Sequence, residues 1–203
     1  ACQDGGTYVR GKVMLLDPHT AHFTVPHQEE KPRVAGAPQL KGAYDPETDK
    51  IYQFGDWHVL IFNPGNGKWQ KIYHNGDLPR RKGGFGSVDL SESEPVRIGR
   101  WLYVVDTKQD RLFRWNIDRA RHLELVSRLP APYARDLSRI GHYLVFFPTW
   151  HWQRPRPIGL FDTVTQSWAE IPYPDWGVEI GASAAVSAER HELFVHGSFE
   201  NAQ

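Results

Sequence analysis

The chain has almost no cysteine, no net charge and no long apolar run. Its single cysteine, Cys2, excludes an intramolecular disulfide and any zinc site built from paired cysteines. Lys plus Arg and Asp plus Glu number 24 each, so no net field attracts nucleic acid or anionic lipid. No apolar run approaches the roughly 20 residues that span a bilayer. We expect neither nucleic-acid nor membrane partners, and the lone cysteine with no visible signal peptide slightly favours a cytoplasmic location.

Aromatic residues, in contrast, are abundant, with 8 Trp, 8 Tyr and 10 Phe. Such residues suit a pleated, half-buried surface. Four segments share one pattern, in which an apolar run leads to Asp or Asn, a polar turn, an aromatic residue or Leu, and an alternating run: 12–25, 59–72, 112–126 and 159–171. The Asp or Asn side chain is expected to bond to the backbone ahead of it, and Gly65 and Gly67 can supply positive φ. Each segment therefore predicts a β-hairpin.

A second set of short β-rich runs completes a repeat of four strands. These runs cover 49–55, 100–106, 142–148 and 191–197, and a further candidate strand precedes each, at 41–45, 84–90, 133–140 and 181–187. No segment sustains a 3.6-residue period, so we expect almost no helix. One motif in about 50 residues, with evenly spaced strands, is typical of a β-propeller.

Several positions resemble the kelch repeat. Pro79-Arg80, the run 103–105, the pair 112–113 and the two tryptophans Trp69 and Trp168 match the family's pattern. The family's glycine pair survives only in part, at Gly5-Gly6, Gly55 and Gly197, and is replaced elsewhere by Asp106 and Pro148. The resemblance implies an all-β propeller, and kelch-type propellers commonly serve as interaction domains.

The repeats predict a single domain, 1–203, with four kelch-like blades. Three blades cover about 41–73, 84–127 and 133–172, and the fourth combines 181–203 with 5–26. We call this last unit the split blade, because the two ends of the chain each supply half of it. Joining them closes the ring and removes exposed strand edges. Two alternatives stay open: an excised run of a larger propeller, and a dimer that completes a larger ring.

Candidate binding residues gather in the loops between second and third strands and in those between blades. The Trp-His pair occurs twice there, as Trp57-His58 and Trp150-His151. Tryptophan rings offer stacking area and arginine offers a planar fork for carboxylate or phosphate. The short turns between first and second strands and between third and fourth strands look structural, with the longer segment 91–99 as an exception. The expected ligand-binding residues are Trp57, His58, Arg80, Arg81, Arg135, Trp150, His151, Trp152, Arg154, Trp176 and His196.

For the other tryptophans we expect structural roles, and we expect no metal site. Tryptophans within strands are expected in the core or between blades: Trp69, Trp101, Trp115 and Trp168. Ring symmetry can direct His58, His151 and His196 at a central channel, where three imidazoles can hold a transition metal. No HExxH motif or paired cysteine supports such a site, so we expect no metal and no cofactor.

Function is less closely specified. The sequence contains no catalytic motif with a recognisable spacing, and this absence disfavours an enzymatic function. We expect a binding module that presents Trp, His and Arg loops on one face to a protein, peptide or glycan, either as a monomer or self-associated through the split blade. The alternatives are an enzyme acting on a small molecule or carbohydrate at the mouth of the channel, with or without a metal, and a ligand-holding ring with a structural role.

Overall fold

The structure of the 203-residue chain is a computed structural model. It is all-β, as predicted, and contains no helix among the described residues. None of that part of the chain can therefore cross a membrane as a long apolar helix. For some strand residues only the backbone is described. The described residues are 3–4, 7–8, 15–17, 20–24, 42–55, 58–73, 90, 93–106, 109–119, 123–130, 133–148, 157–172, 179–187, 190 and 192–198.

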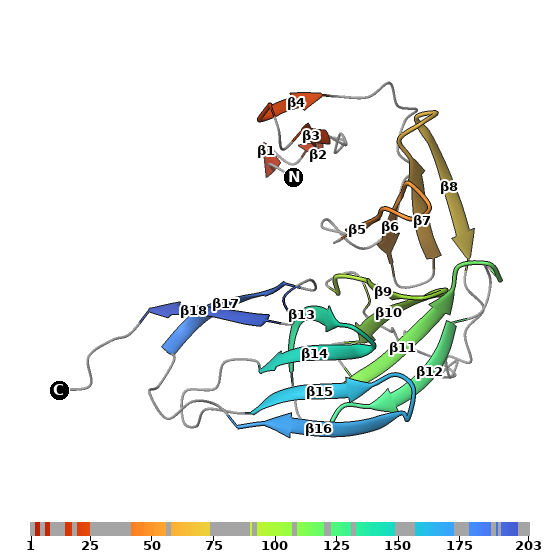
Figure 1. Ribbon diagram of the computed structural model, residues 1–203. Helices are drawn as coiled ribbons and strands as arrows, with labels where there is room; N and C mark the ends of the chain where they lie inside the picture. Colours follow the sequence, from red (N-terminus) through yellow and green to blue (C-terminus); the bar gives the residue numbers. More distant parts are fainter. Residues whose placement is uncertain are drawn as a thin grey trace.

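Three four-stranded antiparallel sheets form the body of the molecule, each with its strands in chain order (Figure 1). The first contains β5 (Gly42–Asp45), β6 (Lys50–Phe54), β7 (His58–Asn63) and β8 (Lys68–Tyr73). The second contains β9 (Val96–Ile98), β10 (Trp101–Asp106), β11 (Arg111–Asn116) and β12 (Leu123–Arg128). The third contains β13 (Tyr133–Ile140), β14 (Tyr143–Pro148), β15 (Ile158–Asp162) and β16 (Ser167–Ile171). These meandering sheets give a propeller-like arrangement.

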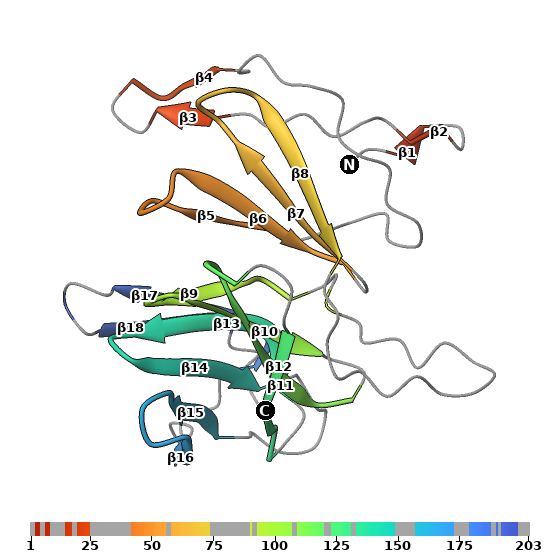
Figure 2. The ribbon, with the colours of Figure 1, turned by 90° about the vertical axis from the view of Figure 1, so that its right-hand side faces the viewer.

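The two ends of the chain form separate two-stranded sheets. They are β1 (Gln3–Asp4) with β2 (Thr7–Tyr8), β3 (Leu15–Asp17) with β4 (His22–Thr24), and β17 (Glu179–Ser187) with β18 (Glu192–Ser198). Among the described residues no pairing joins β18 to β3. Figures 1 and 2 both show the β3–β4 hairpin apart from β17–β18. The split blade and the count of four blades therefore stay predictions.

The Asx turns expected from the repeat are present in all three sheets. The Oδ1 atom of Asn63 accepts the Gly65 N–H at 2.9 Å, and Oδ1 of Asn116 accepts that of Asp118 at 2.9 Å. Oδ1 of Asp162 accepts the N–H groups of Val164 and Thr165 at 2.8 and 3.1 Å. Desolvation acts to raise the pKa of Asp162, but these hydrogen bonds lower it overall. The prediction that these Asp and Asn side chains bond to the backbone ahead of them is confirmed.

Two of the three sheets open with a two-residue turn that needs glycine. Ile98 pairs with Trp101 and Ile140 with Tyr143, so Gly99-Arg100 and Gly141-His142 form the turns. Both glycines have a φ of 59°, whereas Arg100 and His142 are absent from the positive-φ residues. Positive φ at the first central residue alone is the pattern of a type II′ turn, which matches the twist of a hairpin.

Replacing Gly141 with valine is expected to lower the free energy of unfolding by about 1–2 kcal/mol, the cost of a left-handed residue with a Cβ. A Cβ on Gly141 would meet nothing within 4 Å, so the cost is conformational rather than steric. Urea denaturation measures it. Asparagine is among the residues that primed turns accept at positive φ, so the Gly141→Asn variant should lose less than the valine variant. Equal losses in both variants would contradict the turn assignment.

Apolar side chains pack between neighbouring sheets. Between the first and second sheets, Trp115 is fully buried against Tyr52 and Phe54. Between the second and third, the Nε1–H of Trp168 donates to the Ser127 hydroxyl at 3.0 Å, while its ring packs on Phe161. The prediction that strand tryptophans pack in the core or between blades is confirmed for Trp115 and Trp168. These contacts hold the three sheets as one scaffold.

Candidate functional site

The first strands of the three sheets meet toward the middle of the molecule (Figure 1). β13 contacts β9, and a side chain of β9 bridges to β5. A hollow of about 120 Å³ lies among these strands. It is lined by Ala43, Tyr44, Asp45, Pro46, Glu47, Pro95, Arg97, Leu102 and Arg139.

Arg97 is the fixed centre of this hollow. Its Nη1 donates to the Asp45 carboxylate, its Nη2 to Oε2 of Glu47 at 2.8 Å, and its Nε to the Gly99 carbonyl at 2.7 Å. Arg97 is 17% exposed and Asp45 only 2%. All three guanidinium nitrogens are therefore engaged, and the side chain ties the first sheet to the second.

Asp45 occupies its buried place because it ends β5 and begins the next turn. Its Oδ1 accepts the Glu47 N–H at 3.2 Å, and its Oδ2 accepts the Thr48 hydroxyl as well as Arg97. A buried carboxylate needs such partners, because an unpaired charge in the interior is costly. The same residue thus serves the turn, the link between sheets and the wall of the hollow.

Arg139 reaches the hollow from the third sheet and is exposed. Its Nη1 donates to the Arg97 backbone carbonyl at 2.6 Å. Within the described part of the chain no carboxylate forms an ion pair with it. A guanidinium carries five N–H donors, so most of its donor capacity stays open to solvent or a ligand.

Tyr44 forms the exposed rim of the hollow. Its hydroxyl donates to Oδ1 of Asp49 at 3.0 Å. This hydrogen bond to the carboxylate, together with desolvation, raises the pKa of Tyr44. The phenol stays a neutral donor throughout the physiological range, because its ordinary pKa is already about 10.

Few of the expected binding residues lie among the residues that the structure describes. His58 is described in full, whereas only the backbone is described for Arg135 and His196. Arg135 falls in the register break of β13, and His196 pairs with Ser183. The others lie outside the described residues: Trp57, Arg80, Arg81, Trp150, His151, Trp152, Arg154 and Trp176.

His58 packs within its own sheet. The side chain is 5% exposed, and its ring lies so close to Gly55 that a Cβ there would stand 2.6 Å from Cε1. Tyr73 meets the ring edge-on at a centroid distance of 6.5 Å. This packing suits a structural role for His58, and the described residues hold no group of three metal-ligating side chains.

The residues of the hollow were not expected from the sequence. One signal does mark them: the tripeptide Arg-Ile-Gly occurs twice, as 97–99 and 139–141. Each copy ends the first strand of its sheet and enters a type II′ turn, so the two arginines occupy equivalent positions in adjacent sheets. The predictions from sequence set the segment 91–99 apart from the other turns but assign no role to the arginine that the two copies share.

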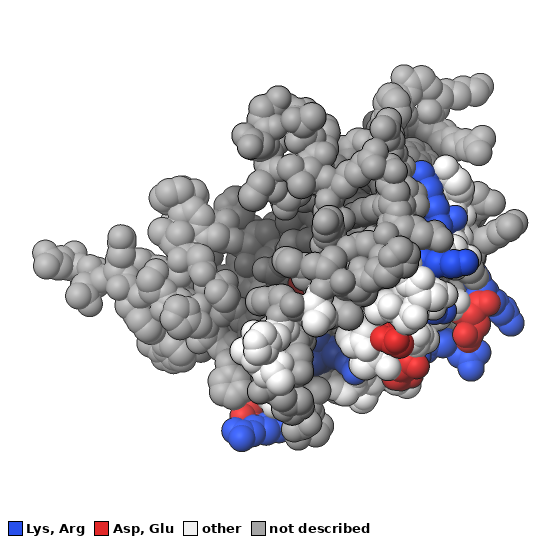
Figure 3. All heavy atoms as spheres, turned by 90° about the horizontal axis from the view of Figure 1, so that it is seen from above, with Lys and Arg blue, Asp and Glu red and all other residues white. Residues whose placement is uncertain are grey.

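Charges of both signs are mixed over the described surface (Figure 3). Lys and Arg side chains lie beside Asp and Glu along the visible rim. Such mixing continues the balance of 24 basic and 24 acidic residues in the whole chain. The described part of this surface therefore carries no broad field of one sign.

No protein-family model matches the chain, and no curated protein matches it. Among solved structures, YjhT is similar at 12% identity and a TM-score of 0.55, over 82% of this chain and 60% of that one. A member of the DUF4221 family from Bacteroides vulgatus is similar at 12% identity and a TM-score of 0.52, over 78% and 52%. Both are β-propeller-type folds, and at such identity the likeness concerns the fold alone.

The N-terminal domain of Nup159 is a weaker match, at 10% identity and a TM-score of 0.46, over 79% of this chain and 44% of that one. The chain thus spans about half the length of the solved structures that it matches. The likeness to YjhT and to the DUF4221 protein supports a propeller-like fold and leaves the kelch assignment a resemblance.

Proposed function

We propose that the chain is a propeller-type binding module that recognises a protein, peptide or glycan partner without transforming it. The observation that carries this proposal is the contrast between the two arginines that line the hollow. Arg97 is held by two carboxylates, while Arg139 beside it presents an exposed guanidinium with no ion-pair partner among the described residues. A rigid frame next to an open donor is an arrangement for recognition.

The carboxylates of the hollow are employed in holding Arg97. A general acid or base must be within reach of a substrate proton and free to exchange it. Asp45 is buried and accepts hydrogen bonds from Arg97, Thr48 and the Glu47 backbone, and Glu47 binds Nη2 of Arg97. These groups therefore favour a binding role over proton transfer.

The proposal extends to the loops between second and third strands and between sheets. Stacking area and anion-binding forks for a partner would come from Trp57, from the Trp-His pair 150–151 and from the arginines at 80, 81, 135 and 154. The chain acts either as a monomer whose split blade closes the ring at four blades, or by self-association through the split blade.

Replacing both Trp57 and Trp150 with alanine is expected to weaken binding of the partner at least about 10-fold, because an aromatic anchor in an interface is worth roughly 1–3 kcal/mol of stacking and burial. The partner is first identified on glycan and peptide arrays, and affinities are then measured by calorimetry. The free energy of unfolding should change little.

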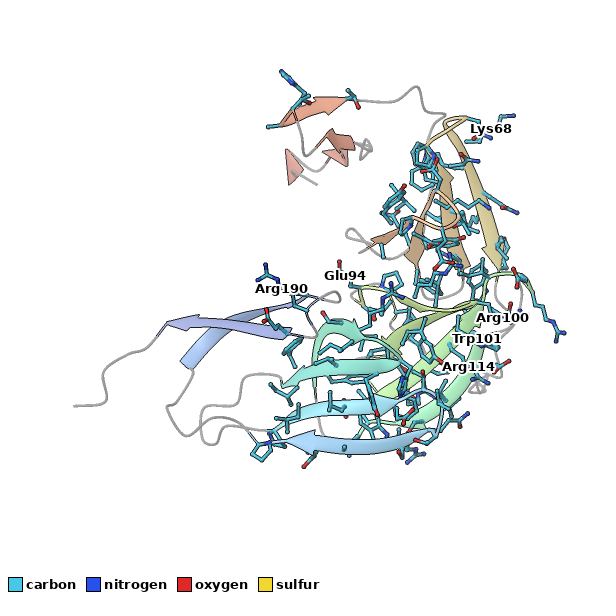
Figure 4. All side chains as sticks on the ribbon, in the orientation of Figure 1. Lys68, Glu94, Arg100, Trp101, Arg114 and Arg190 are labelled. Carbon is cyan, nitrogen blue, oxygen red and sulfur yellow. The ribbon has the colours of Figure 1, made fainter. Side chains whose placement is uncertain are left out.

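Trp101→Ala is the matched control. Trp101 lies in β10 under the Arg114 guanidinium, 4.1 Å from the ring centroid, and Figure 4 shows the two side chains together. Its loss should reduce stability by about 1 kcal/mol and leave affinity unchanged. Retained binding in the Trp57 and Trp150 double variant would contradict the proposed face, and no binder on either array would contradict the module itself.

A further inference from the structure

We infer that the hollow between β5, β9 and β13 is a carboxylate-binding subsite in which Arg139 is the contact residue. The inference rests on the proposed binding function and names the chemistry of one part of the ligand. That chemistry is a single carboxylate on a short aliphatic stem, from either a free carboxylic acid or an acidic side chain of a peptide.

The two equivalent arginines have different tasks. Arg97 uses all three nitrogens within the protein, on Asp45, Glu47 and the Gly99 carbonyl. Arg139 uses one nitrogen, Nη1, on the Arg97 carbonyl at 2.6 Å. That bond orients the guanidinium plane without neutralising its charge. Arg97 is therefore the positioning residue and Arg139 the binding residue.

An oriented guanidinium with open donors prefers a planar, two-oxygen acceptor. Arg and carboxylate form parallel N–H···O bonds of about 2.7–2.9 Å, roughly twice as strong as neutral hydrogen bonds. Because the Arg139 head is oriented before the ligand arrives, less side-chain entropy is lost on binding. The geometry favours a carboxylate over a neutral hydroxyl or amide.

Charge balance favours a monoanionic group over phosphate. Two arginines and two carboxylates, Arg97, Arg139, Asp45 and Glu47, line the hollow and sum to zero. One added carboxylate leaves a single negative charge beside Arg139. A phosphate dianion would leave two, next to the 64%-exposed Glu47 carboxylate, and like charges at close range repel.

The size and lining of the hollow limit the length and polarity of the stem that carries the carboxylate. Its volume of about 120 Å³ approaches the roughly 150 Å³ of a cavity that holds benzene. Apolar atoms come from Ala43, Pro46, Pro95 and Leu102. A stem of two or three methylene groups fits this space, as in a glutamate side chain or in glutarate. One carboxylate of glutarate enters the hollow and the other stays in solvent, so the hollow itself receives a single negative charge.

The test uses glutarate as the probe, titrated into the full chain at low ionic strength and followed by NMR chemical shifts. Arg139→Gln should weaken binding at least about 10-fold, the loss expected for a bidentate charged pair. Arg139→Lys keeps the positive charge but loses the planar pair of donors, so its affinity for glutarate should fall between those of the wild-type chain and Arg139→Gln. Arg190→Gln is the matched control, because Arg190 is exposed between β17 and β18 and does not line the hollow.

Unchanged affinity in Arg190→Gln with loss in Arg139→Gln supports the subsite. Equal loss in both variants shows attraction by net charge alone and overturns it, as does wild-type chain that does not bind glutarate. Tighter binding of inorganic phosphate overturns the carboxylate class. The titration of the wild-type chain tests the subsite without any variant, because failure to bind glutarate overturns the proposal by itself. A folding defect in one Arg139 variant therefore does not decide the outcome.

Two further arms separate this inference from the proposed function. Glutarate and a short peptide with one glutamate are each tested as competitors of the array-identified partner. A partner that binds while glutarate neither binds nor competes overturns the subsite and leaves the binding module standing. Glutarate binding through Arg139 with no macromolecular partner overturns the module and leaves the subsite. Competition by the peptide but not by free glutarate assigns the carboxylate to an acidic side chain.

Discussion

Replacing Trp115 with alanine is expected to lower the free energy of unfolding by about 3–5 kcal/mol, the usual cost of truncating a buried aromatic side chain. Trp115 has no exposed surface and meets Phe54 edge-on, with ring centroids 6.0 Å apart. It belongs to the cluster that joins the first and second sheets. Its removal leaves a cavity at that junction, and urea denaturation followed by circular dichroism measures the loss.

Trp115→Phe separates packing from the polar atom of the indole. Nε1 of Trp115 is buried without a hydrogen-bond partner among the described residues. Phenylalanine keeps most of the aromatic contact and removes that donor, so the cost should be smaller, about 1–2 kcal/mol. A loss below roughly 1 kcal/mol in the alanine variant would contradict the packing of the first sheet on the second.

Replacing Asp45 with asparagine is expected to lower the free energy of unfolding by about 2 kcal/mol and to weaken glutarate binding about 10-fold. Removing one partner of a buried ion pair leaves the other charge poorly compensated. The loss is smaller than for a fully buried pair, since Arg97 is 17% exposed and keeps Glu47. Binding suffers because Arg139 is oriented by the Arg97 carbonyl. Calorimetry of glutarate binding and urea denaturation give the two quantities.

Asp49→Asn is the matched control on the same turn. Asp49 accepts a hydrogen bond from the exposed Tyr44 hydroxyl and has a φ of 49°, which asparagine tolerates. Its replacement should change stability by less than about 0.5 kcal/mol. If Asp45→Asn behaves like this control, Arg97 does not fix the hollow and the account of Arg139 loses its basis.

The local parts of the fold followed from the sequence because short-range chemistry decides them. Asn63, Asn116 and Asp162 each precede a polar turn, and their side-chain oxygens bind the backbone two residues ahead in the structure. Trp115 lies in an apolar run, and its burial required only that the run be a central strand. Of the two turn glycines 65 and 67, only Gly67 has positive φ, at 70°.

The site did not follow from the sequence because contacts between sheets decide it. Arg97 and Asp45 lie in different sheets, and their pairing depends on how β9 approaches β5. Repeat symmetry predicts that His58 faces a channel. In the structure the Gly55 N–H donates to the His58 carbonyl at 2.8 Å, and the His58 ring packs on Gly55. Equivalent positions in a repeat thus share backbone geometry without sharing side-chain environment.

The most direct test of the central claim is a crystal structure of the chain with glutarate. We predict a carboxylate in the hollow with both oxygens about 2.8 Å from Arg139 nitrogens, and with Arg97 still bound to Asp45 and Glu47. Glutarate bound elsewhere with the hollow empty, or glutarate displacing Glu47 from Arg97, would contradict the account.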